Sequence, residues 1–393
     1  MSRFKSPKLN SLAELLPAGH QAIDWTKLEK SEFGIFFDAM ERTMQEPEWH
    51  GEGDVLTHTK MVVERMVELD EYKNAPTKDK LILFLSALLH DIGKPKRTKV
   101  EDGRIVSVGH AVKGANMARE FLWKTLGLSG DEEERDIRES VCTLIRYHAF
   151  PIYATNKSNA ERRMLEIADN GILSPSFSLL KLYVLEKADV LGRISADAKS
   201  QLETLEYFKI MAEDLNCWER PYTFTTPFSK RAYFKGKTEW QGDTLYDSTW
   251  GEVVLLSGLP GTGKDTFIAN NLCDLPVVSL DAIRKRLKIS PVEPQGVVIA
   301  TAQEEAKEYL RKKQPFVWNA TNVTTQTRGK EIELFERYDA RVKTIFLETE
   351  WEENLARNAS RPHPVPSVEI EKMLSKLELP EAKECQTVEW RIT

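Results

Sequence analysis

The residues of this 393-residue chain that are best suited to chemistry are histidines and aspartates in its first half. An adjacent pair, His90 and Asp91, stands in the stretch LLHDIGKPK, followed closely by a glycine and a lysine. A histidine and an aspartate side by side at a helix end can offer two ligands to one metal ion, and imidazole with carboxylate suits Mn, Fe, Co, Ni or Zn. A single histidine on an apolar helix is usually structural, but here several recur in order. The sequence therefore predicts a metal site formed by His58, His90, Asp91, His110, His148 and Asp189.

A second set of residues, beyond position 250, suits the binding of phosphate. The apolar stretch EVVLLS leads into GLPGTGKDT, and the following FIANNL is typical of a helix. In such a loop the glycines let backbone N–H groups turn towards a phosphate, and Lys264 can reach the β- and γ-phosphate oxygens. Asp265 replaces the usual Ser or Thr, so Mg²⁺ could be bound by Asp265, directly or through water, or by Thr266. The predicted nucleotide-binding residues are Gly258, Gly261, Thr262, Gly263, Lys264, Asp265 and Thr266.

Polar residues after this loop could act on the acceptor of a transferred phosphate. Asp281 in VVSLDAIRKRL ends a predicted strand, and Arg284 follows one helical turn later. The aspartate could take a proton from an attacking hydroxyl while the arginine holds an acceptor phosphate. An ordinary helix N-cap is the alternative interpretation of Asp281.

Four further polar residues complete the predicted kinase site. Asn319 and Arg328 follow the predicted strand in FVWNAT and are candidate substrate-binding residues. Arg357 and Arg361 are four positions apart, on one face of a predicted helix. They could close over the phosphates of ATP or simply form a solvated surface.

Two different kinds of structure must position these residues. Apolar residues recur at helical spacing through residues 1–215, for example in KLILFLSALLHDIG, and predict an all-α domain. Residues 251–393 contain short β-branched runs separated by helical stretches, which is typical of an α/β domain with a parallel sheet. The segment 216–250, rich in aromatic and turn residues, is interpreted as a linker.

Within this segment, the stretch SKRAYFKGK interleaves cations with aromatic side chains. The cations could neutralise RNA phosphates while Tyr233 and Phe234 stack on unpaired bases. Alternatively, the aromatic residues pack against a domain and the charges are only solvated. The four basic residues concerned are Lys230, Arg231, Lys235 and Lys237.

The composition is that of a globular protein without membrane or secretory features. The chain is 41% hydrophobic and 30% charged, and its net charge is −6, which argues against broad coating of nucleic acid but permits a local basic groove. Its four cysteines form no CxxC pair, no apolar run approaches the roughly 20 residues of a membrane span, and no signal peptide is recognised. We expect a cytoplasmic protein with no membrane partner.

Residues 45–195 resemble the HD phosphohydrolase superfamily, and most closely the HD domain attached to CCA-adding tRNA nucleotidyltransferases. The shared stretches are WHGEGDV with HT, HDIGKP, HAVKGA and ADVLGR. The resemblance implies that one metal is held by His58, His90, Asp91 and Asp189, and that a second metal or the phosphate faces His110 and His148. It also implies 2′,3′-cyclic, 2′- or 3′-phosphate substrates, with the metal activating water. Lys94 and Arg193 are candidates for phosphate contacts or solvated charges, and His50 could approach the substrate or cap a turn.

Residues 252–390 resemble the phage-type 5′-hydroxyl polynucleotide kinases. Their P-loop, D-x-x-R and R-x(3)-R motifs match, in the same order, Gly258–Thr266, Asp281 with Arg284, and Arg357 with Arg361. The resemblance implies ATP with Mg²⁺ as donor, Asp281 as general base and Arg284 on the acceptor phosphate. Lys264 and Arg361 would stabilise the γ-phosphoryl group in flight. Taken together, nearly the whole chain resembles the bacterial HD-Pnk end-healing enzymes. That implies RNA or DNA ends as substrates, Mn²⁺, Co²⁺ or Ni²⁺ in the HD domain, and a functional link to an RNA ligase.

Two other functions are compatible with the sequence. One is a small-molecule kinase, acting on a nucleoside or metabolite, joined to a nucleotide phosphohydrolase. The other is an ATP-switched regulator whose HD domain senses a signalling nucleotide without turnover. The presence of both Asp281 and Arg284 beside a complete metal set argues against the regulator, since a sensor needs neither.

Overall fold

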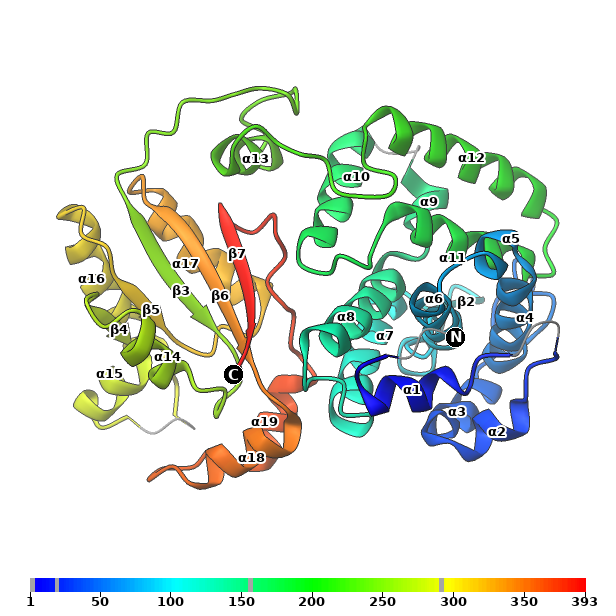
Figure 1. The fold of residues 1–393 in the computed structure, drawn as a ribbon, viewed down its shortest axis with the longest axis horizontal. Helices are drawn as coiled ribbons and strands as arrows, with labels where there is room; N and C mark the ends of the chain where they lie inside the picture. Colours follow the sequence, from blue (N-terminus) through cyan, green and yellow to red (C-terminus); the bar gives the residue numbers. More distant parts are fainter. Residues whose placement is uncertain (1–3, 18–20, 155–157, 290–292) are drawn as a thin grey trace. The chain divides into compact units, whose positions relative to one another are not determined.

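The computed structural model describes residues 4–17, 21–154, 158–289 and 293–393, and the chain forms two compact units, Met1–Tyr222 and Thr223–Thr393 (Figure 1). The division falls inside the segment 216–250, the predicted linker. No helix in the described ranges combines the length and the apolar character that crossing a bilayer would need.

In its described residues the first unit is helical apart from one short hairpin, which confirms the predicted helical domain. The hairpin pairs β1 (Lys99–Glu101) with β2 (Arg104–Val106) in antiparallel fashion. The α-helices of this unit are α1 (Pro7–Ala13), α2 (Trp25–Lys30), α3 (Phe37–Glu41), α4 (Val55–Glu68), α5 (Asp70–Lys73), α6 (Thr77–Leu89), α7 (His110–Glu120), α8 (Glu132–Tyr147), α9 (Phe150–Tyr153), α10 (Ala160–Ala168), α11 (Leu179–Leu191) and α12 (Ala198–Asp214).

Helix α6 is the centre of this unit. Every residue from Leu81 to Leu89 is buried, and a helix that is apolar around its whole circumference belongs in an interior. Helices α4, α8 and α11 pack against it. Asp54 caps the start of α4 and Ser178 caps the start of α11, each accepting a hydrogen bond from a backbone N–H of the first turn. Three helices therefore pack around the element that leads into His90 and Asp91.

The second unit is an α/β domain built on a parallel sheet, which confirms the predicted fold class. In the described residues its strands lie in the order β4-β5-β3-β6-β7, all parallel to their neighbours. Its elements are α13 (Pro227–Phe234), β3 (Glu252–Ser257), α14 (Lys264–Asn271), β4 (Val277–Ser279), α15 (Leu280–Leu287), α16 (Gly296–Arg311), β5 (Val317–Asn319), α17 (Thr325–Glu336), β6 (Arg341–Glu348), α18 (Trp351–Ala359), α19 (Ser367–Leu374) and β7 (Thr387–Ile392).

Apolar side chains cover both faces of this sheet. On one face Val253 and Leu255 of β3 pack with residues of α16 and α17. On the other face Val254 and Leu256 pack with Ile268 of α14. Because all the strands are parallel, their carboxyl ends lie along one edge, where α/β proteins place ligands.

The basic stretch of the predicted linker forms helix α13 and packs within the second unit. Arg231 and Lys235 both pair with Glu336, at 2.7 and 2.6 Å. Lys230 Nζ donates to the backbone oxygen of Ala382 at 3.1 Å, and Tyr233 is buried. These contacts favour the packing interpretation of the stretch over the RNA-binding one.

Candidate active sites

The first unit brings the six predicted metal ligands together. His90 and Asp91 directly follow α6, His58 comes from α4 and Asp189 from α11, while His110 begins α7 and His148 follows α8. The ligand atoms form two groups, each lying within 4.8 Å: His58, His90 and Asp189, and then Asp91, His110 and His148. All except the partly exposed His110 are buried.

Backbone carbonyls fix the tautomers of three of these histidines. The Nδ1 atoms of His90, His110 and His148 lie 2.8 Å from the carbonyl oxygens of Ala87, Ser107 and Ile145. A carbonyl can only accept, so Nδ1 carries the proton and Nε2 keeps its lone pair.

These lone pairs face one another. The Nε2 atoms of His58 and His90 are 3.4 Å apart, and those of His110 and His148 are also 3.4 Å apart. His110 and His148, whose pKa values are lowered, present two neutral lone pairs that repel each other at this separation, and a cation bound to both would relieve the repulsion. The donor set therefore fits a metal ion in each group.

Asp91 lies between the two groups. Its Oδ2 is 3.3 Å from His90 Nε2, and its Oδ1 is 3.4 Å from His110 Nε2. Within the described residues Oδ1 accepts no hydrogen bond. Burial alone would raise the pKa of Asp91, but the charges of Lys94 and His90 hold this pKa well below its usual range. An ionised carboxylate in this place can bind cations on both sides.

Two of the four candidate ligand histidines, His110 and His148, are held neutral, as metal ligands must be. Burial lowers the pKa of His148 to about 3 and also lowers the pKa of His110. His90 differs, because the carboxylate of Asp91 outweighs burial and raises the pKa of His90. A metal ion would compete with a proton at this histidine.

Glu52, which lies in the WHGEGDV stretch, belongs to this centre, although it was not among the predicted site residues. Its Oε1 lies 2.9 Å from Nδ1 of both His50 and His58, and its Oε2 accepts a hydrogen bond from the Ile194 backbone N–H at 2.9 Å. Burial would raise the pKa of Glu52, but the hydrogen bonds from the two histidines lower it instead. Glu52 thus orients His58 for metal binding and joins its loop to the loop after Asp189.

Lys94 and Arg193, the predicted phosphate contacts, lie against Asp91 and Asp189, two of the predicted metal ligands. Lys94 Nζ is 2.6 Å from Asp91 Oδ2 and donates to Gln45 Oε1 at 2.5 Å. Arg193 holds both oxygens of Asp189, with Nε 3.0 Å from Oδ1. In this arrangement the two cations orient the ligand carboxylates, and Lys94 is buried.

Glu186, one turn before Asp189 on α11, is a second carboxyl that the sequence did not reveal. It is fully buried, 3.7 Å from Arg193 Nη2, and neither of its oxygens accepts a hydrogen bond from the described residues. Burial, with the charge of Asp189 added, raises the pKa of Glu186 well above its usual value.

In the second unit the P-loop connects β3 to α14, as predicted. Two of its glycines are required by close backbone contacts: a Cβ at Gly258 would lie 2.5 Å from the Leu347 oxygen, and one at Gly261 would lie 2.6 Å from the Asn354 oxygen. Both have positive φ angles, 147° and 92°. Lys264 Nζ spans the loop and donates to the Gly258 and Leu259 oxygens at 2.9 Å. Burial lowers the pKa of Lys264 to about 8.

Asp281, Arg284 and Arg361 lie together near this lysine. Arg284 pairs with Asp281, and Arg361 Nη2 is 3.6 Å from Asp281 Oδ2. The charges of Asp281 and Arg361 both act on the Lys264 ammonium group. The N-cap of α15 is Ser279, which accepts a hydrogen bond from the Ala282 N–H, so Asp281 is not needed as a cap. Asp281 and Arg361 are thus close enough to act on the P-loop lysine, and Arg284 is held next to Asp281.

Comparison with protein families agrees with both centres. A family model described as an HD domain matches residues 55–171, and one described as an AAA domain matches residues 253–380. The chain joins an HD phosphohydrolase domain to a P-loop kinase-like domain.

Two solved structures are similar to part of the chain. One is described as a putative kinase from Chloroflexus aurantiacus J-10-fl; it is 16% identical, covers 37% of this chain and 89% of its own, and has a TM-score of 0.31. The other is described as a gluconokinase from Sinorhizobium meliloti 1021. It is 20% identical, the match covers 36% of this chain and 82% of that one, and the TM-score is 0.28. Values this low carry no information about the substrate of this chain.

Asn319 and Arg328, the predicted substrate-binding residues of the kinase-like domain, lie in different surroundings. Asn319 is buried at the end of β5, where its Nδ2 donates to Asp265 Oδ1 at 2.7 Å. Arg328 is fully buried; it pairs with Glu384 at 2.7 Å and donates to the Asn322 and Glu378 backbone oxygens. Arg328 is therefore a structural residue, because no substrate can reach a guanidinium so enclosed.

The two predicted lid arginines, Arg357 and Arg361, have different partners in this domain. Arg357 pairs with Glu353 at 2.7 Å and donates to Thr393 Oγ1 at 3.1 Å. Arg361 contacts Asp281 at the longer distance given above. Of the two, Arg361 is the better placed to act on a phosphate near Lys264.

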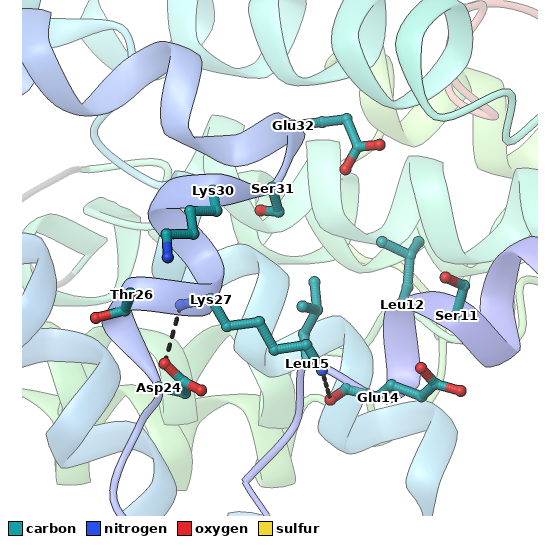
Figure 2. A pocket seen from close by; sticks show the side chains of 10 residues that line it. All are labelled: Ser11, Leu12, Glu14, Leu15, Asp24, Thr26, Lys27, Lys30, Ser31 and Glu32. Carbon is teal, nitrogen blue, oxygen red and sulfur yellow. Dashed lines mark hydrogen bonds between the residues drawn. The ribbon is translucent and has the colours of Figure 1, made fainter.

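The HD-containing unit also has a surface pocket around α1 and α2 (Figure 2). Lys27 crosses it, with Nζ donating to the Glu14 backbone oxygen at 2.8 Å. The pocket is lined by Ser11, Leu12, Glu14, Leu15, Asp24, Thr26, Lys27, Lys30, Ser31 and Glu32. None of these residues belongs to either centre, so the pocket takes no part in the chemistry considered below.

Proposed function

We propose that the protein repairs broken nucleic-acid ends, principally those of RNA. The kinase-like domain would phosphorylate 5′-hydroxyl ends with ATP, and the HD domain would remove 2′,3′-cyclic, 2′- or 3′-phosphates. The observation that supports this most is the placement of Asp281 and Arg361 close to Lys264, with Arg284 held next to Asp281. It supplies a base and an acceptor-binding cation beside the P-loop, in a chain with a second phosphate-processing centre.

In the proposed kinase reaction, Asp281 takes the proton of the 5′-hydroxyl group. The new bond forms between the 5′-oxygen and the γ-phosphorus, while the bond from this phosphorus to the β–γ bridging oxygen breaks and ADP leaves. Lys264 and Arg361 stabilise the charge on the moving phosphoryl group, and Arg284 holds a phosphate of the acceptor strand. Mg²⁺ would be held by Asp265 or Thr266 and would neutralise charge on the nucleotide phosphates.

In the HD domain, the two ligand groups would each hold a metal ion, with Asp91 facing both. The metals would supply Lewis-acid stabilisation of phosphoryl charge and lower the pKa of water. Glu52 fixes the orientation of His58, and Arg193 fixes that of Asp189. Because four imidazoles suit transition metals better than Mg²⁺, we propose Mn²⁺, Co²⁺ or Ni²⁺.

The fusion has a chemical logic under this proposal. Metal-independent RNA cleavage leaves a 5′-hydroxyl and a 2′,3′-cyclic phosphate, whereas ligation requires a 5′-phosphate and a free 3′ end. One domain would prepare each end, and an RNA ligase would act next.

The test is to supply one RNA oligonucleotide that carries a 5′-hydroxyl and a 2′,3′-cyclic phosphate, together with ATP. We expect both ends to be converted, with a far higher kcat/KM for the polynucleotide than for a matched nucleoside or mononucleotide. A kcat/KM for free nucleosides or sugar acids equal to that for RNA would instead support a small-molecule kinase. Nucleotide binding without any turnover would support a regulator.

A further inference from the structure

The residue after the P-loop lysine is an aspartate held in place by the neighbouring strand. Asp265 lies in the first turn of α14, and its Oδ1 accepts the hydrogen bond from Asn319. Asn319 ends β5, where the register sets it beside Leu256 of β3 and Ser279 of β4. The carboxylate is therefore anchored from the sheet, with Oδ2 left without a hydrogen-bond partner in the described part of the chain.

This position normally carries a hydroxyl, which is neutral. A carboxylate here adds one negative charge next to the loop whose backbone N–H groups receive the β-phosphate. In the protein without nucleotide, Lys264 offsets this charge, because Asp265 is the strongest of the carboxylates acting on its ammonium group. When a polyphosphate arrives, the same lysine must also neutralise the phosphate oxygens.

One lysine cannot compensate both the carboxylate and a polyphosphate. Unit charges a few ångströms apart near a protein surface interact strongly enough to change an affinity by about one to two orders of magnitude. A bound divalent cation turns the repulsion between the Asp265 carboxylate and the phosphates into an attraction, because a carboxylate oxygen is a ligand that Mg²⁺ prefers. The charge that repels a bare nucleotide would then attract its metal complex.

We propose that Asp265, positioned by Asn319, makes nucleotide binding conditional on a divalent cation. The kinase-like domain would bind Mg²⁺–nucleotide and reject the metal-free nucleotide far more strongly than a P-loop with serine or threonine in this place. This inference concerns the donor site alone and does not depend on the acceptor being a polynucleotide.

The test is to measure the affinity of the full chain for ADP at equilibrium, once with Mg²⁺ and once with EDTA. Only the part of the binding that is lost in the Lys264→Ala variant is taken as binding to the P-loop. We expect Mg²⁺ to strengthen ADP binding by about a hundredfold or more in the unaltered protein. Asp265→Asn keeps the shape and can still accept the hydrogen bond from Asn319, but it removes the charge. It should strengthen metal-free binding by about tenfold. Asp274→Ser, which removes an exposed charge in the same domain, is the matched control and should behave like the unaltered protein.

Asn319→Ala distinguishes the effect of the Asp265 charge from the effect of its position, because it removes the hydrogen bond from Asn319 and keeps the carboxylate. Because the carboxylate remains, metal-free binding should stay weak, while binding of Mg²⁺–ADP should weaken as the carboxylate loses its anchor. Equal metal-free affinity in Asp265→Asn and the unaltered protein would overturn the proposal. Failure of the unaltered protein to bind Mg²⁺–ADP would overturn the nucleotide site itself, a different result.

Discussion

At the scale of single residues, the HD centre contains a carboxylate, Glu52, outside the six predicted metal ligands. Glu52 contacts His50, His58 and the Ile194 backbone with two oxygens. A carboxylate on Nδ1 raises the basicity of the opposite ring nitrogen and fixes the ring, so its loss typically costs tenfold or more in metal affinity.

We therefore predict that Glu52→Gln weakens Mn²⁺ binding about 10- to 100-fold. The amide nitrogen that replaces Oε2 would face the Ile194 N–H, so two hydrogen-bond donors would meet without an acceptor. The negative charge beside His50 and His58 would also be lost. Isothermal titration of metal-free protein with Mn²⁺ measures this affinity. Glu48→Gln, which alters an exposed glutamate of the same loop region, should leave it unchanged. An unaltered affinity in Glu52→Gln would show that Glu52 does not support the metal site.

Lys264 gives the kinase-like domain a specific dependence on pH. Burial lowers its pKa from 10.5 to about 8, so its ammonium group loses its proton as the pH rises through 8, while an exposed lysine stays charged. The neutral amine attracts phosphate weakly. The kcat/KM for ATP reports the free enzyme and should therefore fall by about tenfold per pH unit above that value.

The pH profile of kcat/KM for ATP measures this prediction, and Lys264→Arg is the control. Arginine remains charged at these pH values, so its activity, although lower, should not show the same alkaline decline. An identical decline in both proteins would assign the titration to another group.

At the scale of elements, the sequence predicted what is local. The P-loop was recognisable because strand, glycines, lysine and helix are consecutive, and Asp281 with Arg284 because they are one helical turn apart. Glu52 and Glu186 were missed because a carboxylate close in sequence to a candidate ligand is common, and only the folded chain shows that Glu52 lies against His50 and His58 and that Glu186 is buried near Arg193. Arg328 was misassigned for a related reason: its position after a strand resembles a site residue, and only the packing of Glu384 against it reveals a buried ion pair.

Helix α13 illustrates the same limit and gives a prediction about stability. Arg231 donates to both oxygens of Glu336 and to the Lys383 backbone oxygen. Such charge-assisted, partly buried contacts contribute about 1.5–3 kcal/mol. We expect Arg231→Ala to lower the free energy of unfolding of the second unit by about that amount and to leave the KM for RNA unchanged. Lys237→Ala, at an exposed position of the same stretch, should change neither quantity. A raised KM for RNA with normal stability would restore the RNA-binding interpretation.

At the scale of the whole molecule, the two centres share no residue. Every predicted metal ligand belongs to the first unit, and the P-loop, Asp281 and the lid arginines belong to the second. The centres also differ in ligand chemistry, since one is rich in imidazole and the other offers oxygen ligands and a nucleotide loop. The two activities should therefore be separable both by mutation and by metal.

We predict that Asp281→Ala abolishes 5′-phosphorylation and preserves phosphate release, and that His90→Ala with Asp91→Ala does the reverse. The first change removes the base beside Lys264 without touching the HD domain, and the second removes ligands from both metal groups without touching the P-loop. Both ends of one RNA oligonucleotide can be followed in the same reaction, with circular dichroism as the control for folding.

For protein freed of metal, Mn²⁺, Co²⁺ or Ni²⁺ should restore phosphate release where Mg²⁺ does not, whereas Mg²⁺ should suffice for the kinase. Loss of both activities in either folded variant would mean that the centres depend on each other, and equal restoration of phosphate release by Mg²⁺ would contradict a site selected by imidazole ligands.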